Sequence, residues 1–279
     1  MRVARVGLHA WEEPPISGNA GSGTIFFSGC SLGCIYCQNA AISRGGAGQV
    51  MDTFELAQAC LDLQAQHALN INMVTPTHFT PSVCASIRIA RTRGLEIPVV
   101  WNTSGYETVQ AIRAHAEAVD IYLTDMKYAD ARLGRALSGV ADYPVVALEA
   151  LEAMVQRTGS PVYDERCGEM RMTRGVIVRH MVLPGHAEDS IEVVRHVHER
   201  FGDDVRLSLM RQYTPTISRA AALGDKRACT TLARFPELAH TVDETDYERV
   251  LDAADRMGVS DYFWQEEGAA SESFIPGFS

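Results

Sequence analysis

Strand-like and helix-like segments alternate along most of this chain, and no other feature limits its possible folds as strongly. Six segments are rich in the β-branched and aromatic residues that favour strands, and most are followed by apolar residues at helical spacing. Alternation of this kind predicts right-handed βαβ units around a parallel sheet. Six units are too few for a closed eight-stranded barrel, so we expect an α/β fold with a partial (β/α)6 TIM-like barrel in a single domain. The strand-like segments are residues 24–28, 71–74, 97–101, 120–124, 175–183 and 205–209.

Local signals mark where helices begin. Asp52 and Glu55 have the spacing of a capping box, and Thr80-Pro81 places proline in a first helical turn. The stretch 158–170 is polar and is predicted to be irregular. We divide the chain into a lead-in or lid segment (1–23), a barrel core (24–215) and a helical extension that packs on the core (216–279). Further helices are expected from about residue 107 and over 130–137, 144–157, 191–201 and 243–257.

Charge and hydropathy exclude some partners. The sequence has 25 Lys and Arg against 35 Asp and Glu, a formal net charge of −10. This balance disfavours binding to the nucleic-acid backbone. No apolar stretch approaches the length that spans a bilayer, and residues 1–6 are too short and interrupted for a signal peptide. We therefore expect a cytoplasmic protein with neither a nucleic-acid nor a membrane partner.

Three of the seven cysteines, Cys30, Cys34 and Cys37, form a C-x3-C-x2-C group directly after the first strand. Clustered thiolates favour an iron–sulfur centre or zinc. Because [4Fe–4S] carriers normally use four cysteines, a group of three leaves one iron for a ligand from outside the protein. The alternative is a structural zinc site, completed by a distant cysteine or by His78. The other cysteines are expected to be core (Cys60) or inert (Cys84 and Cys229), while a functional thiol remains open for Cys167.

The cysteine group, with Tyr36 before its third member and a strand ahead of it, resembles the radical S-adenosylmethionine (SAM) superfamily. Asp125-Met126-Lys127, after the fourth strand, resembles the D-x-K motif of glycyl-radical-enzyme activases. Within the superfamily the chain is thus similar to the group of pyruvate formate-lyase activating enzyme. It resembles in particular an uncharacterised subgroup with the motifs EEPPISG, GSGTIFFSGC and VTPTH, which stand here at residues 12–18, 21–30 and 74–78.

The resemblance implies that Cys30, Cys34 and Cys37 hold one catalytic [4Fe–4S] cluster whose free iron binds SAM. One electron, from a donor such as flavodoxin or ferredoxin, then splits SAM into methionine and a 5′-deoxyadenosyl radical that abstracts hydrogen from the substrate. Longer relatives carry further cysteines ahead of the EEPPISG motif. The printed sequence begins after that point, so we expect a single cluster.

The resemblance also assigns residues at strand ends to SAM, with Tyr36 beside the adenine. Thr75, Thr77 and His78 follow the second strand, where the superfamily usually has Gly-Gly-Glu. Without that carboxylate, threonine hydroxyls and backbone carbonyls are expected to accept hydrogen bonds from the ammonium of SAM. The remaining SAM contacts are expected from Asn102 or Ser104 after the third strand, and from Lys127 (SAM carboxylate) and Asp125 (a hydroxyl or a cation) after the fourth.

Other candidates lie on the fifth strand, after the sixth and ahead of the first. Arg179 and His180, with Gln212 and Tyr213, are expected to approach the ribose or the substrate, although neighbours on a strand face opposite sides, so Arg179 and His180 cannot both point inward. The glycine-rich residues 18–23 precede a strand, which excludes a dinucleotide motif. We expect them to form a flexible turn over the active site, and Trp11, Glu12 and Glu13 to belong to a lid or to contact the substrate.

Three functions remain open from the sequence. An activase would take a hydrogen atom from a glycine of a partner enzyme, leaving a glycyl radical. A second kind of radical SAM enzyme would modify a peptide or a small metabolite. The third function is of another class, a non-catalytic metal-binding or electron-transfer protein. The Asp125 and Lys127 pair counts against it, because electron transfer does not need such a pair. Family resemblance favours the activase.

Overall fold

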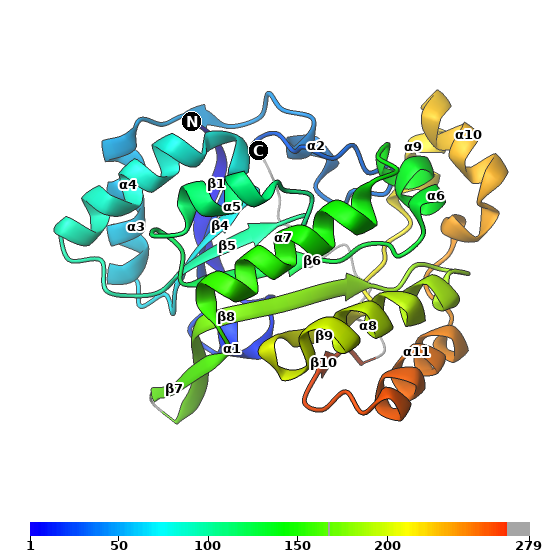
Figure 1. Cartoon of the computed structure of the whole chain (residues 1–279). Coiled ribbons are helices and arrows are strands. Elements are labelled where there is room, and N and C mark those ends of the chain that lie inside the picture. Colours follow the sequence, from blue (N-terminus) through cyan, green and yellow to red (C-terminus); the bar gives the residue numbers. More distant parts are fainter. Residues whose placement is uncertain (167, 267–279) are drawn as a thin grey trace.

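Six parallel strands form the centre of the molecule, as predicted (Figure 1). The computed structural model describes residues 1–166 and 168–266. The strands are β1 (Arg2–His9), β2 (Ser22–Phe27), β3 (Gln49–Val50), β4 (Ile71–Val74), β5 (Val99–Thr103), β6 (Ile121–Asp125), β7 (Val162–Arg166), β8 (Glu169–Met181), β9 (Arg206–Met210) and β10 (Phe263–Trp264).

The order of the strands explains the barrel-like shape. Neighbours in the sheet are β10-β9-β8-β6-β5-β4-β2-β1-β3, and the strands from β2 to β10 along this path pair in parallel. Within the described residues the sheet begins at β10 and ends at β3 without closing. The α/β fold with an open, partial barrel is therefore confirmed.

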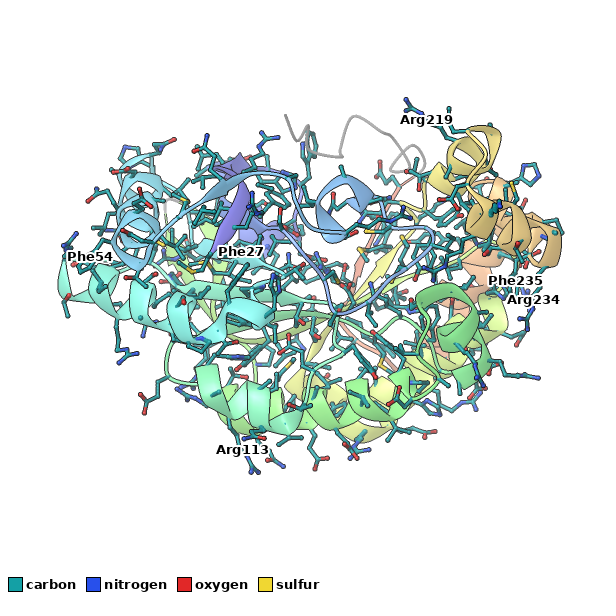
Figure 2. All side chains as sticks on the ribbon, turned by 90° about the horizontal axis from the view of Figure 1, so that it is seen from above. Phe27, Phe54, Arg113, Arg219, Arg234 and Phe235 are labelled. Atoms are coloured by element: carbon teal, nitrogen blue, oxygen red, sulfur yellow. The ribbon has the colours of Figure 1, made fainter. Side chains whose placement is uncertain are left out.

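Helices cover the outer face of the sheet and form an arc in the view from above (Figure 2). The capping box at the start of α3 is confirmed, because Asp52 accepts from the backbone N–H groups of Phe54 and Glu55 while Glu55 accepts from that of Asp52. The helices are α1 (Pro14–Ser17), α2 (Ala40–Ser43), α3 (Thr53–Ala65), α4 (Thr80–Thr92), α5 (Val109–His115), α6 (Ala131–Leu133), α7 (Tyr143–Thr158), α8 (Ala187–Phe201), α9 (Thr216–Ala222), α10 (Lys226–Arg234) and α11 (Glu244–Met257), with short helical turns η1 (Thr77–Phe79), η2 (Gly134–Ser138, a π-helical turn), η3 (Gly202–Asp204) and η4 (Pro236–Ala239).

The core lies between these helices and the sheet. Cys60 is fully buried there, as predicted, together with Trp101, Tyr122 and Tyr143. Among the described residues, no helix is long and apolar enough to cross a bilayer. Cys167 and residues 267–279 lie outside the described part of the chain. The domain boundaries at residues 24 and 216 stay predictions.

Two segments differ from the expectation. Within the stretch predicted to be irregular, residues 162–166 and 169–170 are regular, because they pair as the antiparallel strands β7 and β8. At the start of the chain, β1 pairs antiparallel with β2, from Val3 opposite Phe27 to His9 opposite Ser22. Seven of the eight β1 residues are exposed or partly exposed, so this strand near the sheet edge lacks the apolar character that marked the buried strands.

The segment after β1 closes the amino end of the barrel. Ile16 of α1 is fully buried in a small apolar cluster with inward side chains of β5, β6 and β8. Asn70, at the start of β4, donates to the Ile16 carbonyl, and the Gly23 N–H donates to the Asn70 carbonyl. The expectation that residues 18–23 form a turn over the active site is therefore wrong, since they lie at the opposite end of the parallel strands.

Candidate active site

One cavity of about 250 Å³ opens at the carboxyl ends of the parallel strands. This is the position where α/β barrels carry their chemistry. It brings together eleven of the fourteen residues that the sequence assigned to the site: Cys30, Cys34, Tyr36, Cys37, Thr75, Asn102, Ser104, Asp125, Lys127, Arg179 and Gln212.

The cysteine loop leaves β2 through Gly29, whose φ of 102° favours glycine. All three thiols of the loop are half-buried and free of disulfides. Burial raises the pKa of the Cys30 and Cys34 thiols, and the negative charge of the neighbouring cysteines adds to this. Burial thus disfavours ionisation of Cys30 and Cys34, and a positively charged iron centre between these neighbouring thiols would stabilise their thiolates.

The donor set fits an iron–sulfur cluster better than a zinc ion. Within residues 1–166 and 168–266, no three Cys, His, Asp or Glu side chains stand close enough together to hold one metal ion. In a [4Fe–4S] cluster each cysteine binds a different iron, so its ligands stand around a wider space. The proposed fourth zinc ligand, His78, has its Nε2 within 2.8 Å of the Ser28 carbonyl.

A line of paired charges crosses the cavity floor. Asp125, at the end of β6, accepts from Lys127 Nζ at 2.6 Å and from the Arg179 guanidinium at 3.0 Å. Arg179, on β8, also donates to Glu12 at 3.1 Å and to Asn102 Oδ1 at 2.7 Å. Burial alone would raise the pKa of Asp125, but Lys127 and Arg179 hold it below its ordinary value. Asp125 likewise raises the pKa of Lys127 well above its ordinary value despite burial, so Lys127 is a permanent cation.

Tyr143, from α7, fixes the ends of β5 and β6 against each other. Its hydroxyl lies 2.8 Å from the Ser104 carbonyl oxygen and 3.0 Å from that of Asp125, which share its one proton, and it accepts from the Lys127 N–H at 3.0 Å. Gly105, at φ 77°, makes room for this contact, because a Cβ there would lie 2.1 Å from the Asp125 carbonyl oxygen. Gly105 is therefore a turn residue, and the Asp125 and Lys127 pair is held at the cavity by backbone contacts.

Thr75 lines the cavity in a conformation that threonine rarely adopts. Its φ is 56°, in the left-handed region, although it is β-branched. Its N–H donates to the Asn102 carbonyl at 2.8 Å, which ties the loop after β4 to β5. Strained backbone of this kind tends to occur at functional sites.

Three predicted site residues do not reach the cavity. Thr77 begins the short turn η1, and its hydroxyl donates to the buried Glu107 at 2.5 Å. His78 packs behind the cysteine loop, where a Cβ on Gly29 would lie 3.0 Å from its Nε2. His180 faces the opposite side of β8 from Arg179, with Nδ1 2.7 Å from the Met126 carbonyl, and burial lowers its pKa to about 4.

Of the candidates that remain, Gln212 and Tyr36 line the cavity and Tyr213 does not. Gln212 lines the cavity, and its carbonyl accepts from the Gln38 side chain at 2.7 Å. Tyr213 turns away and donates to the Leu238 carbonyl at 2.7 Å. Tyr36 lines the cavity, while its hydroxyl lies 2.6 Å from that of Tyr128.

The floor of the site contains polar residues that the sequence pattern did not place there. Glu12 was expected in a lid or at the substrate, yet its carboxylate accepts from Asn72 at 2.8 Å and from Arg179 inside the barrel. Trp11 also lines the cavity, whereas Glu13 is buried. The signal that would have found Asn72 is a polar residue within the apolar run of β4, since a buried polar group needs a partner.

Comparison with known proteins identifies the family. The model of the family described as Radical SAM superfamily matches residues 24–198. An uncharacterised protein of Methanocaldococcus jannaschii, MJ0674, is 25% identical over 259 residues, which cover 90% of this chain and 66% of that protein.

Solved structures share the fold at low identity. SuiB of Streptococcus suis bound to the precursor peptide SuiA has a TM-score of 0.55 at 15% identity and covers 86% of this chain. SuiB bound to SAM gives 0.52 at 15% over 87%, and HydG, a maturase of the [FeFe]-hydrogenase, gives 0.55 at 16% over 90%. The chain spans about half of these proteins, 48%, 46% and 53%. With the family match over more than half of its length, this chain belongs to the radical SAM superfamily, whose cofactors are a [4Fe–4S] cluster and SAM.

Proposed function

We propose that this protein is a radical SAM enzyme similar to pyruvate formate-lyase activating enzyme, which takes a hydrogen atom from a glycine of a partner polypeptide. The observation that carries the proposal is that the three cysteines share one cavity with Asp125 and Lys127 of the D-x-K motif. When bound, the cluster supplies one electron that splits SAM into methionine and a 5′-deoxyadenosyl radical.

The chain's own residues would hold SAM at the cavity. Cys30, Cys34 and Cys37 hold three irons. Lys127, a permanent cation, attracts the SAM carboxylate, and the hydroxyl and backbone of Thr75 accept from its ammonium. Neutral acceptors on Thr75 would thus take the place of the glutamate in the Gly-Gly-Glu segment of other superfamily members. The carboxylate of Asp125 is paired with Arg179.

The electron would come from a carrier such as flavodoxin or ferredoxin, and the natural compartment would be the cytoplasm. Free thiols support this placement, because thiolate ligands persist in a reducing compartment. A non-catalytic electron carrier is the weaker alternative, since the paired charges around Arg179 serve no purpose in electron carriage.

A second candidate is modification of a peptide or a small metabolite without a glycyl-radical partner. The fold shared with SuiB, which was solved with a precursor peptide, favours a peptide over a metabolite in that case. The two candidates differ in the molecule that donates the hydrogen atom and not in the SAM chemistry.

Substitution of one cysteine tests the shared chemistry. In anaerobically reconstituted protein, Cys34→Ala should abolish reductant-dependent formation of 5′-deoxyadenosine from SAM, because a cluster ligand is lost. The circular dichroism spectrum should stay that of the folded protein. Cys229→Ala, an exposed cysteine on α10, is the matched control and should keep full activity. Full activity of Cys34→Ala would refute the ligand assignment.

The partner is tested separately. Wild-type protein, SAM and a reductant are incubated with glycyl-radical enzymes encoded near this protein, and the glycyl radical is sought by electron paramagnetic resonance. A radical on the partner supports the activase. Deoxyadenosine formation with a modified peptide and no such radical would favour the second candidate.

A further inference from the structure

A hydrogen-bonded line of three hydroxyl groups ends on the middle cysteine. Ser138 Oγ lies 2.9 Å from Cys34 Sγ, Tyr128 Oη lies 2.7 Å from Ser138 Oγ, and Tyr36 Oη lies 2.6 Å from Tyr128 Oη. All three hydroxyl residues are buried, with 3% of Ser138, 0% of Tyr128 and 4% of Tyr36 exposed, so water does not compete for these bonds. The SAM chemistry described above makes no use of Ser138 or Tyr128.

The backbone holds this line in place. Ser138 ends the π-helical turn η2, and Gly139 follows in the left-handed conformation at φ 84°. The Ile35 N–H, next to Cys34, donates to the Leu137 carbonyl at 2.8 Å. The turn therefore contacts the cysteine loop twice, once through its backbone and once through Ser138. Isolated π-helical turns occur often at functional sites.

Cluster binding would give the line a single direction. A thiolate accepts hydrogen bonds and donates none, so Ser138 must donate to Cys34. Each hydroxyl has one proton to donate. Ser138 then accepts from Tyr128, and Tyr128 accepts from Tyr36. Successive bonds in such a line polarise one another, which strengthens the last donor.

The three cysteines differ in this respect. Cys30 Sγ accepts from the Leu32 backbone N–H at 3.4 Å. Cys34 has the shorter side-chain donor. Hydrogen bonds to the sulfurs are one of the means by which a protein sets the potential of an iron–sulfur cluster.

We propose that Ser138 is a positioning residue that donates a hydrogen bond to the Cys34 thiolate and raises the reduction potential of the cluster, and that Tyr128 and Tyr36 orient its hydroxyl. Reduction adds negative charge to the cluster and its thiolates, so a donor to Cys34 stabilises the reduced form more than the oxidised form. The proposal rests on Cys34 being a cluster ligand.

The test is a redox titration of the reconstituted holoprotein, followed by electron paramagnetic resonance of the reduced cluster. At a fixed solution potential, Ser138→Ala should lower the ratio of reduced to oxidised cluster by roughly three- to tenfold; tenfold corresponds to about 59 mV for a one-electron couple. Tyr128→Phe should lower it less, since Ser138 keeps its proton but loses its orienting partner. Ser138→Thr, which keeps the hydroxyl, should restore the wild-type ratio.

Iron content separates this proposal from the ligand assignment. Ser86, a fully buried serine on α4 that donates to the Ser82 carbonyl, supplies the control variant Ser86→Ala, with an unchanged potential. A Ser138→Ala protein with four irons and the wild-type potential would overturn the proposal. So would loss of the cluster from that variant, because Ser138 would then hold the cluster and not set its potential. A Cys34→Ala protein that keeps its cluster and SAM cleavage overturns the ligand assignment instead.

Discussion

At the scale of single residues, the cavity floor keeps four charged groups out of water by pairing each with another. Arg179 is the centre of this arrangement, with Asp125, Glu12 and Asn102 as its partners. Removing one partner of a buried pair usually costs about 3–5 kcal/mol, because a charge is left without compensation. The floor is therefore a rigid polar surface that presents fixed charges to the cavity.

Thr75 lends itself to a prediction about strain. Thr75→Gly should raise the free energy of unfolding by about 1 kcal/mol, since glycine adopts a φ of 56° without the penalty of a β-branched residue. The same change should weaken SAM binding, because it removes a hydroxyl from the cavity. Urea unfolding and calorimetric titration with SAM measure the two effects.

His67→Gly is the matched control. His67 also has a positive φ, 66°, but is exposed and lies away from the cavity. It should gain similar stability with unchanged SAM affinity. A Thr75→Gly protein that is less stable than wild type would contradict the assignment of strain.

The sequence could predict which strand ends carry the site residues, but not which side each residue faces. Arg179 and His180 are adjacent and both polar, and only the twist and register of β8 decide that Arg179 points inward. Thr77 and His78 failed as candidates because the chain turns into η1 directly after Thr75, which carries them behind the loop. Tertiary contacts, not local pattern, decide such cases.

At the scale of elements, the contact between the turn after β5 and the end of β6 sets the position of Asp125 and Lys127. Gly105→Ala should destabilise the fold by about 2–4 kcal/mol, since its Cβ would overlap the Asp125 carbonyl in addition to the cost of a positive φ. Gly94→Ala, at φ 101° with open space around it, bears the conformational cost alone. The difference between the two variants in the free energy of unfolding, measured with urea, gives the cost of the contact with the Asp125 carbonyl. Equal losses of stability in both variants would argue against this contact.

The contact between helix α5 and strand β5 includes a buried, neutral histidine, His115, and is therefore expected to weaken in acid. His115 is 1% exposed, stacks on Trp101 at 4.1 Å, and has no hydrogen-bond partner on either ring nitrogen among the described residues. Burial lowers its pKa to about 4, from 6.5. The unfolded chain therefore binds this proton first, so stability is full above pH 6.5 and falls as the pH drops towards 4, by up to roughly 3 kcal/mol.

His115→Phe should flatten this part of the pH profile, as measured by urea unfolding between pH 4 and 7. The exposed His240 provides the comparison variant His240→Gln, which should keep the wild-type slope. An unchanged slope in His115→Phe would show that other groups cause the acid sensitivity.

Elements were predicted best where both faces are buried. The six parallel strands are mostly buried and rich in β-branched and aromatic residues, and start signals mark helices α3 and α4, so the existence and order of these elements followed from the pattern. The edge strand β1 and the β7–β8 hairpin are half-exposed, and their pairing depends on partners distant in the sequence or on a turn beside Cys167. The sequence pattern carried no comparable signal for them.

At the scale of the whole molecule, charge is distributed unevenly. The chain has a net charge of −10, but the cysteine loop (29–48) and the α9–α10 segment (216–235) together hold five basic residues and one acidic residue. Figure 2 shows Arg219 and Arg234 on this helix pair. Arg227 of α10 is exposed and lies against the loop, 3.5 Å from the place of a Cβ on Gly33. An acidic electron carrier would be drawn to this face, beside the cluster ligands.

Arg227→Glu should slow reduction of the cluster by an acidic flavodoxin roughly tenfold at low ionic strength, with the difference disappearing at high salt. Stopped-flow absorbance measures the rate. Arg113→Glu makes the same charge change on α5, away from the α9–α10 pair (Figure 2), and should have little effect. Equal slowing in both variants would mean that net charge, and not this face, attracts the carrier.

The closed amino end of the barrel bears on how this protein can be shortened. The segment matched by the superfamily model begins at residue 24. Two residues that precede it contact the inside of the barrel, because Glu12 accepts from Arg179 and Ile16 is buried in the apolar cluster at the base. A truncation at the family boundary would retain every cysteine and still open the base to solvent, releasing the guanidinium that anchors Asp125. The residues ahead of position 24 are thus needed to close the base of the barrel beneath the cavity.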